Sequence, residues 1–134
     1  MNNLKAKIAI VLLLASLSAL FVPKAADAAG IDGVCASGEM CAWKNSGAGG
    51  PIFDNPNSVT NYSYFNFWAS CGTWGCSNVN DEISSVKNRG TQCPMTMFKN
   101  SGYTGSSVFI PNDGVVYNIG GGFNDSLSSG HFCH

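Results

Sequence analysis

The stretch Trp43-Lys44-Asn45-Ser46-Gly47-Ala48-Gly49-Gly50 recurs in altered form as Phe98-Lys99-Asn100-Ser101-Gly102-Tyr103-Thr104-Gly105. Each copy is an aromatic residue followed seven positions later by a glycine, and the copies lie 55 residues apart. A glycine at such a place lets the chain fold back where a side chain would clash or where φ is positive. The repeat therefore predicts two hairpins of one kind, each with an aromatic residue packed on its turn.

A second block of sequence recurs in the same order. The block Asn80-Asp81-Glu82-Ile83-Ser84-Ser85 aligns with Asn124-Asp125-Ser126-Leu127-Ser128-Ser129. The first copy begins 30 residues after Gly50 and the second 19 residues after Gly105, so the first half carries about 11 extra residues in its middle. Two ordered blocks indicate a duplicated unit, which we place at about residues 35–90 and 91–134.

The composition after residue 28 favours strands over helices. This part of the chain has a single leucine and a single glutamine, whereas its 16 glycines separate short apolar and aromatic runs. Such a pattern is typical of an antiparallel sandwich or barrel. We expect strands at residues 40–43, 51–53, 62–68, 83–86, 95–98, 107–110 and 115–118.

The first 28 residues have the features of a secretory signal peptide. Lys5 and Lys7 precede an apolar run over residues 8–22, and Ala26-Asp27-Ala28 offers small residues at a cleavable spacing. The apolar run is too short to favour a permanent membrane anchor. We therefore expect cleavage after Ala28 and a secreted, extracellular chain of residues 29–134.

The charge of residues 29–134 narrows the class of partner. Four basic and seven acidic side chains give a net charge of −3. This balance argues against nucleic acid and against a basic membrane-surface helix. The two histidines, His131 and His134, flank Cys133 and do not suggest a Ser-His-Asp arrangement. We expect a monomeric protein that is not an enzyme.

All six cysteines follow residue 28. An even number of cysteines in a small exported chain predicts disulfides. A zinc site is the alternative, but it needs close C-x2-C pairs or a histidine partner. The spacings here are C-x5-C and C-x4-C, which favour disulfides.

The paired blocks, aromatic-x6-Gly followed by Asn-Asp-x-x-Ser-Ser, resemble the βγ-crystallin superfamily over about residues 35–133. The resemblance implies an all-β, disulfide-braced sandwich of two Greek-key motifs. The C-x5-C ahead of Trp43 and the cysteine that opens the second repeat are similar to the secreted microbial metalloproteinase inhibitors of crystallin-like fold.

This resemblance implies a disulfide between Cys35 and Cys41. We also expect bonds within the pairs Cys71 and Cys76, and Cys93 and Cys133, although the sequence alone leaves other connectivities open. In such inhibitors the bond presented to the peptidase follows the cysteine that opens the second repeat, which here is Cys93-Pro94. Proline departs from the residues that a substrate-like bond prefers.

The resemblance further implies two calcium ions, each shared between the two units. One unit supplies an aspartate, and the other supplies a serine hydroxyl and a backbone carbonyl, all oxygen ligands of the kind that calcium prefers. A further carbonyl comes from the hairpin turns at residues 46–49 and 101–104. One carboxylate per site implies affinity on the order of 10⁻⁵ to 10⁻³ M. The implied ligands are Asp81, Glu82 (carbonyl), Ser84, Asp125, Ser126 (carbonyl) and Ser128.

Two alternatives stay open at this point. The Asn-Asp-x-x-Ser-Ser blocks are also able to form Asx- and Ser-turns that cap strands without a metal. The extra residues of the first half contain an aromatic run, 61–68, with the composition of core and edge strand, and then Cys71-Gly72-Thr73-Trp74-Gly75-Cys76. A disulfide-closed tip that carries Trp74 favours a partner-contact surface.

Three functions follow from these observations. The first is inhibition of a secreted metalloprotease, with Trp74, Cys93 and Pro94 as contact residues. The second is a calcium-stabilised structural or cell-surface interaction module without inhibitory activity. The third is an exported toxin or antimicrobial effector, although the weak net charge argues against simple membrane lysis.

Overall fold

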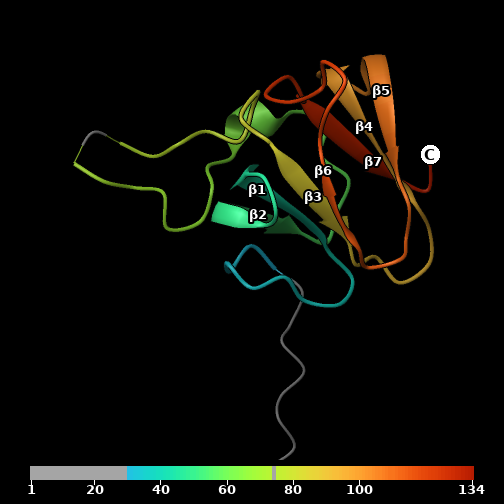
Figure 1. Cartoon of the computed structure of the whole chain (residues 1–134), viewed down its shortest axis with the longest axis horizontal. Coiled ribbons are helices and arrows are strands. Elements are labelled where there is room, and N and C mark those ends of the chain that lie inside the picture. Colours follow the sequence, from blue (N-terminus) through green and yellow to red (C-terminus); the bar gives the residue numbers. More distant parts are fainter. Residues whose placement is uncertain (1–29, 74) are drawn as a thin grey trace, which may run out of the picture.

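The computed structural model describes residues 30–73 and 75–134 and arranges them in two antiparallel β-sheets (Figure 1). One sheet has the strand order β2-β1-β3-β6 and the other β5-β4-β7. No α-helix occurs among the described residues, and the predicted all-β class is confirmed. The elements are β1 (Met40–Asn45), β2 (Gly49–Asn55), the 3-10 turn η1 (Tyr62–Tyr64), β3 (Ser85–Asn88), β4 (Met95–Asn100), β5 (Thr104–Ile110), β6 (Val116–Asn118) and β7 (Ser129–Phe132).

Each half of the chain contributes a segment to the sheet of the other half. Strand β6, from the second half, pairs with β3 and completes the sheet of the first half. In return, Val59 of the first half bridges Gly130 of β7, with backbone hydrogen bonds of 2.8 and 2.9 Å in the two directions. The duplicated units therefore form one intertwined sandwich and not two independent pieces.

The two repeated hairpins have the predicted shape. In both, the register shifts between the aromatic residue of the block and the asparagine two positions later. Gly50 (φ 72°) and Gly105 (φ 79°) lie in the left-handed region, and an added Cβ would lie 2.7 Å from the side-chain nitrogen of Asn45 or Asn100. Both glycines are thus required by conformation and by space.

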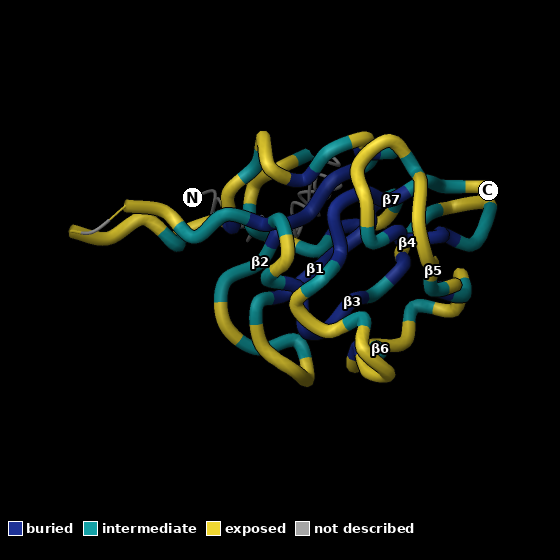
Figure 2. The backbone as a smooth tube through the Cα atoms, turned by 90° about the horizontal axis from the view of Figure 1, so that it is seen from above, coloured by how far each residue is buried: buried dark blue, intermediate teal, exposed yellow. Residues whose placement is uncertain are grey.

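The core lies between the two sheets, where Figure 2 shows the buried segments running through the middle of the molecule. Ile83 and Leu127, at equivalent positions of the repeated blocks, are fully buried. The rings of Phe53 and Tyr62 meet edge-on, with centroids 5.8 Å apart. Apolar residues of the two Asn-Asp loops and of both hairpins therefore share one core.

The expectation of a strand at residues 62–68 is wrong. The chain instead forms η1, where the Asn61 side chain accepts a hydrogen bond from the Ser63 amide at 2.9 Å. Tyr62 is buried, whereas Tyr64 is 80% exposed. The Asn61 cap favours a turn over strand pairing at this place. The aromatic residues of the segment alone do not predict whether the turn or the strand forms.

Strand β7 was not predicted, and strand β3 begins later than the predicted 83–86. The sequence of β7, Ser-Gly-His-Phe, contains no β-branched residue. It is a strand because it pairs with β4 along its whole length. A Cβ on Gly130 would lie 2.2 Å from the Tyr62 hydroxyl, so this glycine admits the tyrosine ring against the sheet.

Three disulfides brace the sandwich: Cys35–Cys41, Cys71–Cys76 and Cys93–Cys133. These are the pairs named from the sequence. The predicted signal peptide and Trp74 lie outside the described residues. Among the residues described, no helix has the length and apolar character needed to cross a membrane.

Candidate functional site

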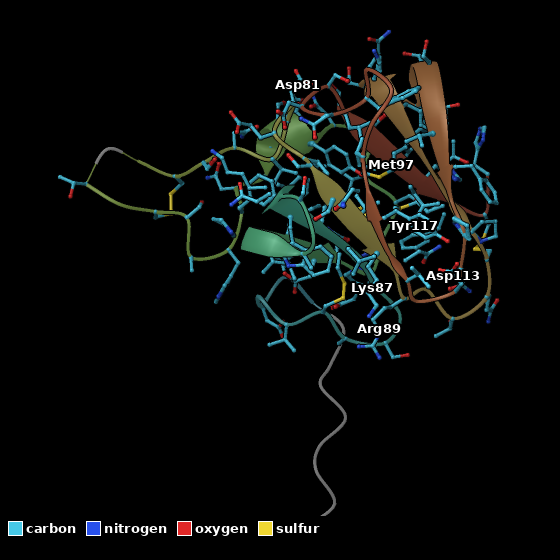
Figure 3. All side chains as sticks on the ribbon, in the orientation of Figure 1. Asp81, Lys87, Arg89, Met97, Asp113 and Tyr117 are labelled. Atoms are coloured by element: carbon cyan, nitrogen blue, oxygen red, sulfur yellow. A yellow bond between two sulfur atoms is a disulfide. The ribbon has the colours of Figure 1, made fainter. Side chains whose placement is uncertain are left out.

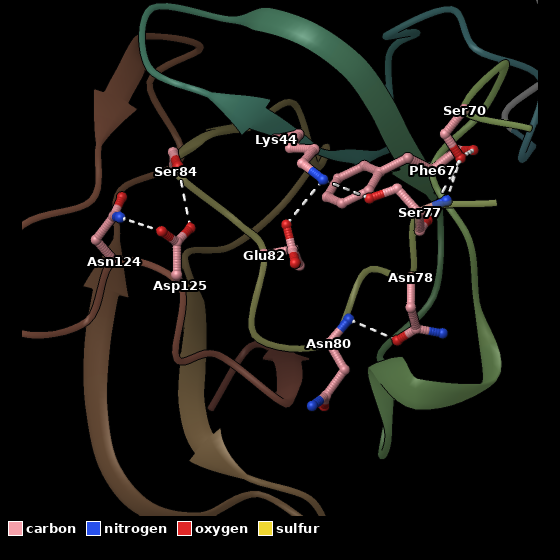
Figure 4. A network of polar contacts seen from close by, with 10 residues as sticks. All are labelled: Lys44, Phe67, Ser70, Ser77, Asn78, Asn80, Glu82, Ser84, Asn124 and Asp125. Carbon is pink, nitrogen blue, oxygen red and sulfur yellow. Dashed lines mark hydrogen bonds and ion pairs between the residues drawn. The ribbon is translucent and has the colours of Figure 1, made fainter. Parts of the chain in front are cut away.

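The two Asn-Asp loops adopt the same conformation. Asp81 and Asp125 both have positive φ, 55° and 50°, a region that aspartate enters more readily than most residues. The side-chain nitrogen of Asn80 donates to Asp81 Oδ2 at 2.6 Å. That of Asn124 donates to Asp125 Oδ2 at 2.7 Å (Figure 4). Each asparagine therefore orients the carboxylate that follows it.

The two loops exchange contacts across the junction of the halves. Ser84 Oγ donates to Asp125 Oδ1 at 3.2 Å, as Figure 4 shows, and Ser128 Oγ donates to Asp81 Oδ1 at 3.2 Å. The backbone amide of each aspartate also donates to the carbonyl of the apolar residue in the opposite loop, at 3.1 and 3.2 Å. Each predicted serine ligand is thus paired with the aspartate of the other half.

Two buried serines tie the hairpin turns to these loops. Ser85 Oγ donates to the Asn45 carbonyl at 2.6 Å and accepts from the Ala48 amide at 3.0 Å. Ser129 makes the same two contacts with the second hairpin, at 2.6 and 3.1 Å. Each hairpin turn is therefore held next to the Asp-Ser loop of its own half.

The side chains of the other two predicted ligands, Glu82 and Ser126, contact different partners. The Glu82 carboxylate forms an ion pair with Lys44 Nζ at 2.9 Å, and Lys44 also donates to Ser77 Oγ at 2.7 Å (Figure 4). Ser126 Oγ donates to the Gly122 carbonyl at 3.0 Å. Both side chains have partners within the protein, which leaves the predicted role of these residues to their backbone carbonyls.

The side-chain oxygens of each Asp-Ser pair suit a hard cation. The aspartates are exposed, and the serines Ser84 and Ser128 are each only 8% exposed. Within residues 30–73 and 75–134, no group of three or more His, Cys, Asp or Glu side chains is placed to hold a metal. The carboxylate and the hydroxyl of each pair are oxygen ligands, which suit calcium and not a soft metal.

A separate feature, which we call the finger (residues 70–77), projects from the first half. Figures 1 and 2 show it extending away from the body of the molecule in both views. Gly72 and Gly75 exchange backbone hydrogen bonds of 2.9 and 3.1 Å, and the Cys71–Cys76 disulfide closes the tip. The described residues 71–73, 75 and 76 are all exposed.

The base of the finger is held by hydrogen bonds. Ser70 Oγ donates to the Phe67 carbonyl at 2.6 Å and accepts from the Ser77 amide at 3.1 Å, and the Phe67 amide donates to the Ser77 carbonyl at 3.0 Å. Lys44, through its bond to Ser77, joins this base to the first Asp-Ser loop. The base of the finger is therefore joined by hydrogen bonds to the body of the protein.

Comparison with known protein families gives a direct match. A family model described as peptidase inhibitor family I36 matches residues 28–110, more than half of the chain. The chain belongs to peptidase inhibitor family I36. The match includes the finger and the first Asn-Asp block of this I36 chain. A search of curated proteins finds no match.

Solved structures show that the I36 chain has the βγ-crystallin fold, as predicted. A structure from work on the evolution of the eye lens βγ-crystallin domain fold has a TM-score of 0.57 at 21% identity, covering 78% of this chain and 93% of its own. A βγ-crystallin from Ciona intestinalis gives 0.53 at 22% identity, with 71% and 99% covered. A βγ-crystallin from an archaeon gives 0.50 at 20% identity, with 72% and 98% covered.

The I36 chain has a second surface that the sequence suggested for peptidase contact. Cys93 and Pro94 are half-buried, and Cys93 borders a pocket together with Gln92. The Cys93 carbonyl accepts from the Asn88 side chain at 3.1 Å, and the Pro94 carbonyl accepts from the Cys133 amide at 2.9 Å. The carbonyls on both sides of this bond are thus engaged within the protein.

Sequence reasoning missed two features near these surfaces. The repeat aligns Lys44 with Lys99, but the two lysines have different partners. Lys44 pairs with Glu82, whereas Lys99 lies over the Phe123 ring, 5.1 Å from its centroid. The buried carboxylates of Glu39 and Asp54 carry no pattern that distinguishes them from surface acids. Only the folded arrangement reveals either feature.

Proposed function

We propose that the chain inhibits a secreted metallopeptidase and presents the finger to the active-site cleft of that enzyme. Membership of peptidase inhibitor family I36 supports inhibition. The resemblance to secreted microbial metalloproteinase inhibitors supports the class of target. The observation that carries the proposal is the finger itself, a disulfide-closed projection whose residues 71–73, 75 and 76 are exposed (Figure 1).

The finger is suited to an enzyme cleft by its rigidity and its slender tip. A segment already held in one conformation loses little entropy on binding. The disulfide, the paired glycines and the Ser70 contacts restrain the finger before any partner arrives. Because Gly72 lacks a side chain and Thr73 is small and exposed, an enzyme is able to approach this side of the finger closely.

The finger is a better candidate than the Cys93-Pro94 bond. That bond is half-buried, and the carbonyls on either side accept hydrogen bonds from Asn88 and Cys133. An enzyme would have to replace those internal bonds before it could hold the segment as it holds a substrate. In the finger, the described residues 71–73, 75 and 76 are all exposed, and the backbone bonds of Gly72 and Gly75 join these two residues only to each other.

A matched pair of substitutions tests this assignment. Thr73→Arg places a long charged side chain on the finger, and Thr91→Arg makes the same change at an exposed residue beside Cys93. We expect Thr73→Arg to raise the inhibition constant by about tenfold or more, roughly 1.4 kcal/mol, with an unchanged melting temperature. Thr91→Arg is expected to leave inhibition unchanged.

Each other outcome has a distinct meaning. Loss of inhibition by Thr91→Arg alone would move the presented segment to Cys93-Pro94. If the native chain inhibits no member of a panel of secreted metallopeptidases, the proposed function fails. Stabilisation by calcium in that case would favour the structural interaction module.

We also propose that each Asp-Ser pair holds one calcium ion that stabilises the sandwich. Asp125 would act with Ser84, and Asp81 with Ser128, because the oxygens of each pair are 3.2 Å apart. The asparagine contacts to Oδ2 fix each carboxylate with Oδ1 toward the serine. Binding to the folded chain alone would stabilise it by about 3 kcal/mol per site at calcium a hundredfold above Kd.

A calcium titration followed by thermal unfolding tests this second proposal. We expect the melting temperature to rise over the millimolar range in the native chain. Asp81→Asn and Asp125→Asn should each remove part of the rise, and the exposed Asp113→Asn, outside both loops, should remove none. A flat titration up to several millimolar would leave the loops as strand caps without a metal.

A further inference from the structure

Two carboxylates are completely buried near the start of the described chain. Glu39, just before β1, and Asp54, in β2, both have 0% exposure. Glu39 accepts hydrogen bonds from the amides of Gly30 and Ala36, the latter at 2.7 Å. Asp54 accepts from the amides of Asp32 at 2.9 Å and Gly33 at 3.1 Å. Residues 30–36 are therefore wrapped around two acidic side chains.

These carboxylates have no cationic partner among the described residues. The one ion pair found there joins Lys44 and Glu82. Arg89, which Figure 3 shows at this end of the molecule, donates its guanidinium to the Cys35 carbonyl at 2.6 Å and not to either carboxylate. A buried charge without a counter-charge is unfavourable even when backbone amides satisfy its oxygens.

Burial changes the pKa of both carboxyl groups. Burial raises the pKa of Glu39, and the negative charges of Asp54 and Asp32 raise it further, against the lowering effect of the Ala36 and Gly30 amides. Burial likewise raises the pKa of Asp54. In the part of the chain that the structure describes, both carboxylates are thus buried without a counter-charge.

The sequence places the source of such a charge next to the cluster. Cleavage after Ala28 would leave the α-amino group on Ala29. That residue precedes Gly30, whose amide already donates to Glu39. Consecutive Cα atoms are only about 3.8 Å apart, so chain connectivity keeps the new terminus one residue from Gly30, the residue whose amide contacts Glu39.

We propose that Glu39 forms a binding site for the α-ammonium group that leader removal creates, so that processing supplies the missing counter-charge. The proposal rests on the cleavage expected from the sequence and is independent of inhibition and of calcium. Before cleavage the chain at residue 29 offers only a neutral amide. After cleavage it offers a cation, which stabilises residues 30–36 and, through the neighbouring Cys35–Cys41 disulfide, the start of β1.

Three forms of the secreted chain test this site. One begins at Ala29 with a free amino group, the second has the same sequence with an acetylated terminus, and the third begins at Asp27, so that its free amino group is two residues away. We expect the first form to have an unfolding equilibrium constant about tenfold or more below those of the other two. Glu39→Gln should abolish that difference.

A second measurement tests the site on the native chain and does not depend on whether the Glu39→Gln variant folds. NMR titration of the native chain, labelled at Ala29, should give the α-amino group a pKa above its ordinary range of roughly 7.7–8.0. An ordinary pKa for that group, or equal stability of the free and acetylated forms, would overturn the proposal. Mass spectrometry of the exported protein should find Ala29 at the terminus, and a terminus at any other residue would also overturn the proposal.

Discussion

The Asp-Ser loops of the two halves are near copies, whereas the segments between hairpin and loop differ in length and in the elements that they form. Corresponding loop contacts agree to 0.1 Å: 2.6 and 2.7 Å for asparagine to carboxylate, and 3.2 Å twice for serine to carboxylate. Between them, the first half builds η1 and the finger, and the second half builds β6. The repeated parts hold the fold together, and the part that is not repeated is free to carry a contact surface.

The strongest test of this equivalence is the core residue of each loop. Ile83→Ala and Leu127→Ala both remove a fully buried side chain at the same position of the repeat. Each should lower the free energy of unfolding by about 2–5 kcal/mol, and the two losses should be similar. Urea denaturation measures both, and a loss below about 1 kcal/mol for either one would break the equivalence.

The hairpin glycines provide a second, smaller test. Gly50→Ala and Gly105→Ala force a side chain into positive φ and against an asparagine. We expect each to lower stability by about 1–3 kcal/mol. Gly120→Ala is the control, since an added Cβ there meets nothing within 4 Å. Near-zero effects at both hairpins would show that the turns rearrange easily.

The two lysines of the repeat should sharpen the contrast between the halves. Lys44 forms a half-exposed ion pair with Glu82, whereas Lys99 lies over the Phe123 ring. Lys44→Ala should lower stability by about 0.2–1 kcal/mol, and this effect should shrink in about 1 M salt. Lys99→Ala should cost about 0.5 kcal/mol. Equal salt dependence of the two variants would contradict the assigned partners.

The smallest effect concerns β6, the segment of the second half that completes the sheet of the first half. The Tyr117 hydroxyl donates to Asp113 Oδ2 near the exposed end of this segment (Figure 3), and this bond lowers the pKa of Asp113. The resulting stabilisation is present above the ordinary pKa of aspartate and is lost as the pH falls through the lowered value. Tyr117→Phe should raise the pKa of Asp113 toward 3.8, which NMR titration measures; an unchanged value would contradict the bond.

The repeated blocks made most of the fold predictable. Glycine at a fixed distance from an aromatic residue determines a hairpin through local sterics, and an Asn-Asp turn determines its own conformation in the same way. For that reason the hairpins, and the residues of the Asp-Ser pairs, could be named before the structure. The pairing of each aspartate with the serine of the other half was predicted from the resemblance to βγ-crystallins.

The other features depend on long-range packing. Strand β7 exists because β4 pairs with it, and Gly130 is required because Tyr62 lies against it. The turn η1 replaces a predicted strand because a local cap prevails over an alternating pattern. Burial of Glu39 likewise arises from the path of residues 30–36, which no local sequence pattern encodes.

The central claim is that the finger, the unrepeated part of the first half, is the surface that an enzyme contacts. NMR spectra of the ¹⁵N-labelled chain, recorded with and without a metallopeptidase that it inhibits, test this claim directly. The account predicts that the largest amide changes fall on residues 70–77, with small changes at the two Asp-Ser loops and near Cys93. Strong changes around Cys93 and Pro94, with an unaffected finger, would contradict it.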